Sequence, residues 1–181
     1  MNFKQTTSPG IKLCYVLIVF AVLSRLVPHP YNFTPVGALG LFAGSYLPLR
    51  RFWLVPVIAL LVSDVFLGFY HPIAMISVYM SFVLCGVIGR SVLMQKRSII
   101  RLAVTSLSAS CLFFIVSNFG DWLSQINHYP MTFNGLLQCY AMAIPFFGNT
   151  IAGDLFYVAV LFGVYEAVNY RIHQLHNAKT A

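Results

Sequence analysis

Charged residues are almost missing from two long stretches of this sequence. Between Arg51 and Arg90 the only one is Asp64, and between Arg101 and Asp154 the only one is Asp121. Over the whole chain 59% of residues are hydrophobic and 8% are charged, whereas soluble domains average about 25% charged residues. Because so few charges cannot cover the surface of a soluble domain of this size, lipid is the expected solvent for most of the chain.

The apolar runs predict an all-α, polytopic membrane protein with six transmembrane helices in one integral membrane domain, residues 1–181. A bilayer core about 30 Å thick needs about 20 apolar residues per helix. By this measure the spans are residues 12–27, 35–47, 52–69, 73–93, 99–123 and 150–169. Segment 129–147 is apolar but contains Pro130 and Pro145. We therefore predict an interfacial or re-entrant helix before the last span, and a seventh span is the alternative.

The basic residues orient this predicted bundle. With the N-terminus in the cytoplasm, ten of the 11 Lys and Arg residues fall on the inner side and only Arg25 falls toward the outside. The positive-inside rule therefore predicts cytoplasmic N- and C-termini for a multi-pass membrane protein. The net charge of +7 does not predict nucleic-acid binding, because the basic residues are dispersed between apolar runs. The ten inner residues are Lys4, Lys12, Arg50, Arg51, Arg90, Lys96, Arg97, Arg101, Arg171 and Lys179.

In this orientation the polar residues of the spans gather in one layer on the outer side. A charged side chain in a bilayer costs at least about 2.5 kcal/mol, so such residues usually face a cavity or each other. Two interpretations stay open: a structural lock in which Arg25 pairs with Asp64 or Asp154, and a small-molecule pocket near the outer face. The candidate substrate-binding residues are Arg25, Asn32, Asp64, His71, Asn118, Asp121, Asn149 and Asp154.

Among the acids we expect Asp154 to matter most. The predicted span 150–169 puts it in the first helical turn, where the helix macrodipole favours a carboxylate by roughly 0.3 to 1 kcal/mol. Gly37, Gly40 and Gly44 form a separate small-residue surface, and Gly40 and Gly44 have the GxxxG spacing that lets another helix approach closely. Packing within the chain and contact with a partner both remain open for these glycines.

The sequence lacks the motifs that are typical of common enzyme classes. It has no HExxH, GxSxG or Walker sequence, and we predict no catalytic residue, no enzyme activity and no cofactor. Cys14, Cys85, Cys111 and Cys139 lie in apolar runs without CxxC spacing, so we predict small buried hydrophobes and no metal site.

Several phrases of the sequence are similar to known proteins. "RLVPHPYNFTPVGALGLFAGSYL", "LLVSDVFLGFYH", "FFIVSNFGDWL", "YPMTFNGLLQCYAMAIPFFGNTIAGDL" and "FGVYEA" resemble a bacterial family of small integral membrane proteins of unknown function. The overall layout resembles the substrate-binding S-components of energy-coupling factor (ECF) vitamin transporters. That resemblance implies six helices, cytoplasmic termini, a pocket near the outer face, and docking to a transmembrane coupling subunit and ATPases.

The leading functional hypothesis is a membrane-embedded substrate-binding or uptake protein. It would be the substrate-capture subunit of a micronutrient transporter, with a vitamin or metal ion as substrate. The alternatives are a standalone ion-coupled secondary transporter and a structural or assembly protein without substrate. The sequence does not identify the substrate.

Overall fold

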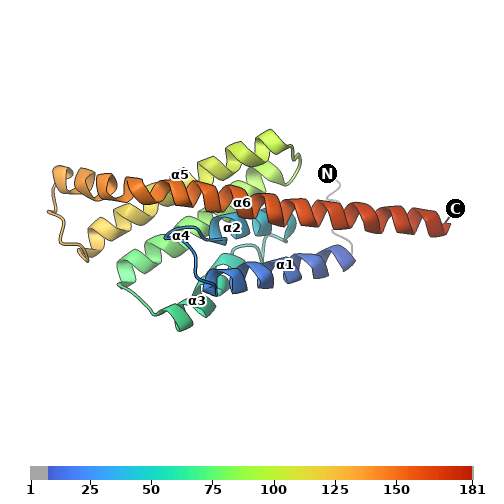
Figure 1. Cartoon of the computed structure of the whole chain (residues 1–181), viewed down its shortest axis with the longest axis horizontal. Coiled ribbons are helices and arrows are strands. Elements are labelled where there is room, and N and C mark those ends of the chain that lie inside the picture. The colour runs from blue at the N-terminus through green and yellow to red at the C-terminus, as the bar shows by residue number, and fades with distance from the viewer. Residues whose placement is uncertain (1–7, 181) are drawn as a thin grey trace.

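Residues 8–180 are described by a computed structural model, in which they form six α-helices and one short π-helical turn (Figure 1). Lys4 and the side chain of Lys179, both used above to orient the chain, lie outside what is described. The elements are α1 Ser8–Leu26, α2 Val36–Tyr46, α3 Leu54–Leu67, α4 Pro72–Ile88 with its π-helical continuation η1 Gly89–Leu93, α5 Ile99–Ser124 and α6 Phe133–Thr180. The predicted all-α class is confirmed.

Three segments of the described chain are long and apolar enough to cross a membrane: Pro72–Leu93, Ile99–Ser124 and Phe133–Ile172. They suggest a multi-pass membrane protein. Helices α2 and α3 are apolar but short, with 11 and 14 residues. At 1.5 Å per residue they reach only about 16 and 21 Å, well below a bilayer core of about 30 Å. Crossing by all six helices therefore remains a prediction.

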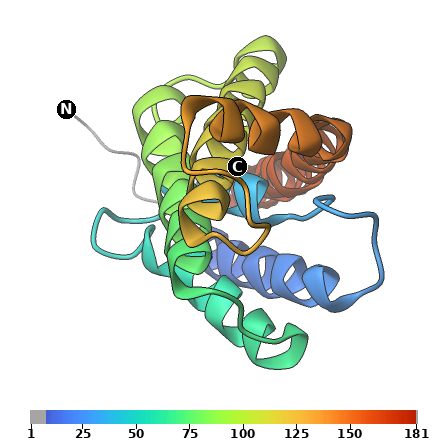
Figure 2. The same cartoon turned by 90° about the vertical axis from the view of Figure 1, so that its left-hand side faces the viewer.

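Helix α2 lies inside the bundle and not at its surface. Ten of its 11 residues, Val36–Ser45, are buried. It packs against α4 through glycines, and against α6 through rings such as Phe42 and Phe162, whose centroids are 5.3 Å apart. In the perpendicular view of Figure 2 the other helices surround α2. A short helix is tolerated here because protein, not lipid, satisfies the backbone groups at its ends.

The predicted interfacial or re-entrant helix before the last span is wrong. Segment 133–147 is the first part of α6, which continues without interruption through Pro145 to Thr180. Pro145 favours a break in the helix, because proline lacks a backbone N–H and crowds the preceding turn. Within a membrane bundle, neighbouring groups can satisfy the freed carbonyl. Tyr140 and Cys139 also fix this part of α6 against α5, by bonds to the carbonyls of Ile115 and Asn118.

The connections between helices alternate between two ends of the bundle (Figure 1). Connections 27–35, 68–71 and 125–132 form one end and contain no Lys or Arg. We call this the uncharged end. Connections 47–53 and 94–98 form the other, which we call the basic end because it holds Arg50, Arg51, Lys96 and Arg97. The α5–α6 hairpin reaches much farther at the uncharged end than α1 does, and α6 projects past the bundle at the basic end.

Labelling of single cysteines tests the membrane orientation. Gln95 and Asn127 are exposed residues of the basic and uncharged ends. In intact cells an impermeant maleimide should label an Asn127→Cys variant, whereas a Gln95→Cys variant should react only after lysis. The unmodified protein, which carries four free cysteines in the described chain, is the background control. The reverse labelling pattern would invert the proposed orientation.

Candidate functional site

A partly open cavity of about 220 Å³ lies where the end of α1 and the start of α2 meet the middle parts of α4, α5 and α6. Its wall combines one cation, one carboxylate, three uncharged polar side chains and apolar or aromatic groups. The lining residues are Arg25, Asn32, Thr34, Val36, Tyr70, Val78, Phe82, Phe113, Thr150 and Asp154. Three of the eight predicted site residues, Arg25, Asn32 and Asp154, therefore meet at one cavity.

Arg25 is held by a buried ion pair at the edge of this cavity. Its Nη1 atom donates to Asp64 Oδ1 at 2.8 Å and also to the Ser63 hydroxyl. The Tyr79 hydroxyl donates to Asp64 Oδ2 at 2.7 Å. Asp64 is 1% exposed, so this network joins α1, α3 and α4 away from water. The lock interpretation thus describes Arg25, and of the two acids considered its partner is Asp64.

Asp154 faces the cavity without a cationic partner. It is 4% exposed, and its Oδ2 atom accepts a hydrogen bond from Ser110 Oγ at 2.7 Å. The backbone N–H of Ala38 is a second neutral donor. No salt bridge to Asp154 occurs among the side chains that the structure describes. A Cβ atom at Gly37 would overlap the Asp154 carboxylate, so glycine at this position makes room for the acid.

The position of Asp154 differs from the prediction. Because α6 begins at Phe133, Asp154 lies about six turns into the helix and not in its first turn. The favourable macrodipole of a helix N-terminus therefore does not act on it, since that effect fades within the first turn. Its partner Ser110 lies near the middle of α5. Asp154 therefore lies beside the middle of α5, away from both ends of that helix.

Connection 27–35 borders the cavity on the side of the uncharged end, through Asn32 and Thr34. Asn32, which lines the cavity, adopts a left-handed conformation with φ of 62°, which asparagine tolerates better than most residues. Asn149 Nδ2 donates to the Tyr31 carbonyl at 3.0 Å and so ties this connection to α6. Phe33 packs on Tyr157 with ring centroids 5.9 Å apart. Asn149 therefore holds connection 27–35 in place and does not line the cavity.

Tyr70, from connection 68–71, also lines the cavity. Burial is the main cause that raises its pKa to about 12, and the nearby Asp64 carboxylate adds to the shift. The phenol is consequently neutral at physiological pH. It offers an aromatic ring and an uncharged hydroxyl to the cavity, and no additional charge.

Asn118, Asp121 and His71 do not line this cavity, so the structure does not bring the eight predicted site residues together in one cluster. Asp121 is about three turns beyond Ser110 along α5, where its Oδ2 atom accepts from Asn127 Nδ2 at 2.8 Å. Asn118 donates to the Phe114 carbonyl of its own helix. His71 caps α4, and its Nδ1 atom accepts from the Ile73 N–H at 3.3 Å. These side chains are engaged in local structure.

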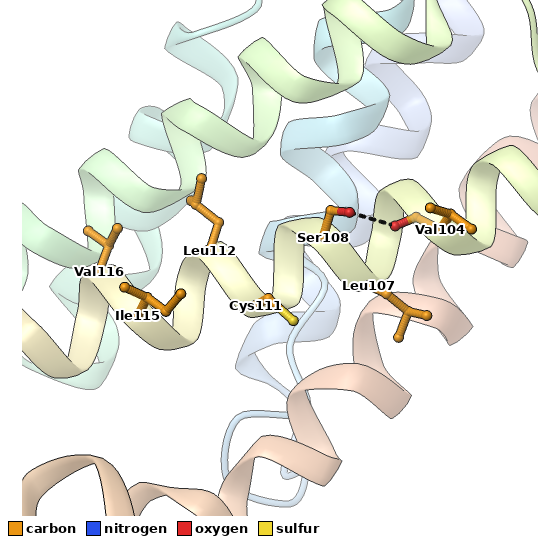
Figure 3. A pocket seen from close by; sticks show the side chains of 7 residues that line it. All are labelled: Val104, Leu107, Ser108, Cys111, Leu112, Ile115 and Val116. Atoms are coloured by element: carbon orange, nitrogen blue, oxygen red, sulfur yellow. Dashed lines mark hydrogen bonds between the residues drawn. The ribbon is translucent and has the colours of Figure 1, made fainter. Parts of the chain in front are cut away.

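A larger depression of about 600 Å³ runs along α5 (Figure 3). Its lining is almost entirely apolar, and the Ser108 hydroxyl is already bonded to the Val104 carbonyl of the same helix. A groove without converging polar groups has little means of selecting a solute. The lining residues are Val104, Leu107, Ser108, Cys111, Leu112, Ile115 and Val116.

The cysteines are not all buried. Cys111 is exposed in this groove, contrary to our prediction, whereas Cys14, Cys85 and Cys139 are buried as predicted.

The predicted small-residue surface is used inside the chain. A Cβ atom on Gly40 would lie 2.7 Å from the Phe82 carbonyl oxygen, and one on Gly44 would overlap the Gly86 carbonyl. Gly40 and Gly44 therefore let the α2 backbone contact the backbone of α4, whereas Gly37 makes room for the Asp154 side chain of α6. The surface is therefore occupied and does not face outward.

A second polar cluster, at the basic end, was not among the predicted site residues. Glu166 accepts a hydrogen bond from the Tyr46 hydroxyl at 2.6 Å and lies 3.5 Å from Arg97 Nε. The Arg97 guanidinium also lies 4.3 Å from the centre of the Tyr46 ring. Glu166 is the only glutamate in the sequence, and this was the one feature of the sequence that could have marked it as a candidate. This cluster ties the C-terminal end of α2 to α6 and to connection 94–98.

Within the described residues no group of three or more His, Cys, Asp or Glu side chains is arranged to hold a metal ion. The described chain is all-α, its three long apolar helical segments suggest a multi-pass membrane protein, and a partly open polar cavity lies between its helices. The chain belongs to the family of unknown function DUF6580, whose family model matches residues 5–175. No curated protein and no solved structure matches it.

Proposed function

We propose that this protein is a membrane-embedded substrate-binding protein that captures a small solute from the outer side of the bacterial cytoplasmic membrane. The observation that carries the proposal is the cavity of about 220 Å³ beside connection 27–35, whose otherwise apolar wall holds a carboxylate, an ion-paired arginine, three hydroxyl groups and one side-chain amide. Small-molecule sites usually combine an apolar wall with a few converging polar groups.

The energetic argument concerns Asp154 in particular. An acid that only fastened helices together would be expected to have a cationic partner, as Asp64 has in Arg25. Asp154 instead has neutral donors and borders the cavity. Because burial of a carboxylate without a counter-ion is costly, a site that keeps one is a candidate for function.

The distribution of basic residues supports capture from outside. The cavity is bordered by two connections of the uncharged end, and the positive-inside rule assigns that end to the outer face. Uptake would then require release on the basic side. As in the S-components that the sequence resembles, this step would be driven by a coupling subunit and ATPases.

Cavity-filling variants test the capture of a solute. Thr150→Phe and Val78→Phe place a ring in the cavity from α6 and α4. We expect the unmodified protein, purified in mild detergent, to release a bound small molecule on denaturation, detectable by mass spectrometry. Both filled variants should release at least about tenfold less, because the added ring takes up the space of the solute.

Leu107→Phe is the matched control, because it adds an aromatic ring to the α5 groove and leaves the cavity unchanged. It should retain the solute as the unmodified protein does. Equal retention by all three variants would exclude the cavity as the binding site. No retained or added solute for the unmodified protein would favour a structural or assembly role. Uptake into liposomes by the protein alone would favour the secondary-transporter alternative.

A further inference from the structure

We propose that the cavity recognises a small organic cation of the alkylammonium class, with Asp154 as its counter-ion. This inference rests on the proposed function and adds the chemical class of the solute. It combines three independent observations on the cavity wall: its charge, its aromatic content and its small volume.

The two ionisable side chains that line the cavity, Arg25 and Asp154, differ in whether they have an oppositely charged partner. Arg25 is the one cation that lines the cavity, and Asp64 at 2.8 Å neutralises it. Asp154 is the one carboxylate that lines the cavity, and its partners Ser110 and Ala38 are uncharged. Tyr70 contributes a neutral phenol. The wall therefore holds one acid without a cationic partner, and a cationic solute would supply that partner.

The aromatic side chains define the kind of cation. Tyr70, Phe82 and Phe113 come from a connection, α4 and α5 and line the same cavity. The rings of Phe82 and Phe113 are stacked, with centroids 4.7 Å apart. Aromatic faces attract ammonium groups, and quaternary ammonium ligands are commonly bound within such rings. An alkylammonium ion satisfies both parts of the wall, because its alkyl groups pack on the rings and its charge faces Asp154.

A bare metal ion fits this cavity less well. Divalent ions such as Ca²⁺ take six to eight oxygen ligands, usually including several carboxylates. Here Asp154 is the only lining carboxylate, and no cluster of three acidic, His or Cys side chains occurs in the described part of the chain. The volume of about 220 Å³ is below the usual range of roughly 300 to 1,000 Å³ for pockets of drug-sized ligands, which favours a compact solute.

The test compares two probes of the same shape and different charge. Choline carries a permanent positive charge, and 3,3-dimethylbutan-1-ol is its neutral carbon isostere. Binding of each would be measured by calorimetry on the full chain in lipid nanodiscs, after removal of any co-purified solute. We expect choline to bind and the isostere to bind at least about tenfold more weakly, because only choline pairs with the carboxylate.

Two substitutions assign the effect to the proposed groups. Asp154→Asn should weaken choline about ten- to hundredfold and leave the isostere unchanged, since only a charge-dependent interaction is lost. Phe113→Leu should weaken choline severalfold by removal of one ring. This second variant keeps the test decisive if Asp154→Asn does not fold. Asp121→Asn is the matched control, because this acid lies away from the cavity and should leave both affinities unchanged.

The outcomes separate this inference from the proposed function. Equal binding of both probes, no choline binding, or a co-purified solute that is neutral or anionic would overturn the ammonium assignment. In the last case solute capture would stand. If the protein retains no solute and binds neither probe, both proposals fail.

Discussion

Replacing Gly44 by alanine is expected to lower the stability of the protein by about 3 kcal/mol, through a single added methyl group. The new Cβ atom would overlap the Gly86 carbonyl and lie 3.0 Å from the backbone N of Arg90. Overpacking usually costs about 1 to 3 kcal/mol. We place this case at the upper end because the clashing atoms are backbone, which cannot rotate away, and α2 is buried at the centre of the bundle.

The measurement is the apparent melting temperature in detergent, together with the yield of monodisperse protein on size exclusion. Gly163→Ala is the matched control, because a Cβ atom there meets nothing within 4 Å. It should leave stability unchanged or raise it by up to about 1 kcal/mol, since alanine has the higher helix propensity. A Gly44→Ala protein with unmodified stability would show that α2 and α4 are not in backbone contact.

Removal of one partner of the Arg25–Asp64 pair should cost about 3 to 5 kcal/mol, the usual range for leaving a buried charge uncompensated. Asp64→Ala should be the more damaging change, because it also deprives the Tyr79 hydroxyl of its acceptor. The double variant Arg25→Met/Asp64→Leu should recover most of the loss, since it removes both charges and keeps the volume filled. A double-mutant cycle of melting temperatures measures the coupling.

Arg51→Gln is the control for this cycle. Arg51 is exposed at the basic end, where its Nη1 atom lies 3.3 Å from the Tyr15 hydroxyl. Its replacement should change stability by no more than about 0.5 kcal/mol. Additive effects of the two single substitutions, with no recovery in the double variant, would contradict the role of Arg25 and Asp64 as a coupled lock.

Much of the fold could be predicted from the sequence, because hydropathy and charge act locally along the chain. The short helix predicted at residues 35–47 is α2, Val36–Tyr46, and the span predicted at 99–123 is α5, Ile99–Ser124. These boundaries follow from prolines, glycines and charged connections. The continuation of α6 through Pro145 could not be predicted in this way, since it depends on contacts with α5 that lie far away in sequence.

The candidate site was harder to predict for the same reason. Arg25 and Asp64 could be paired by charge, but the sequence left Asp64 and Asp154 as equal alternatives. Which acid is chosen depends on the three-dimensional arrangement of α1, α3 and α6. Once α6 is assumed to begin near Thr150, Asp154 is placed at the wrong depth and Asn118 and Asp121 are grouped with it. The contact between Tyr46 and Glu166 joins residues 120 positions apart, and no local pattern reveals it.

The enclosed position of α2 has a consequence for biogenesis. A helix of 11 residues, about 16 Å long, is too short for the insertion machinery to recognise as an independent membrane segment. Its final place also does not exist until α4 and α6 have been synthesised, because its glycines and rings pack against those later helices. The packing of α2 can therefore be completed only after α6 has been translated.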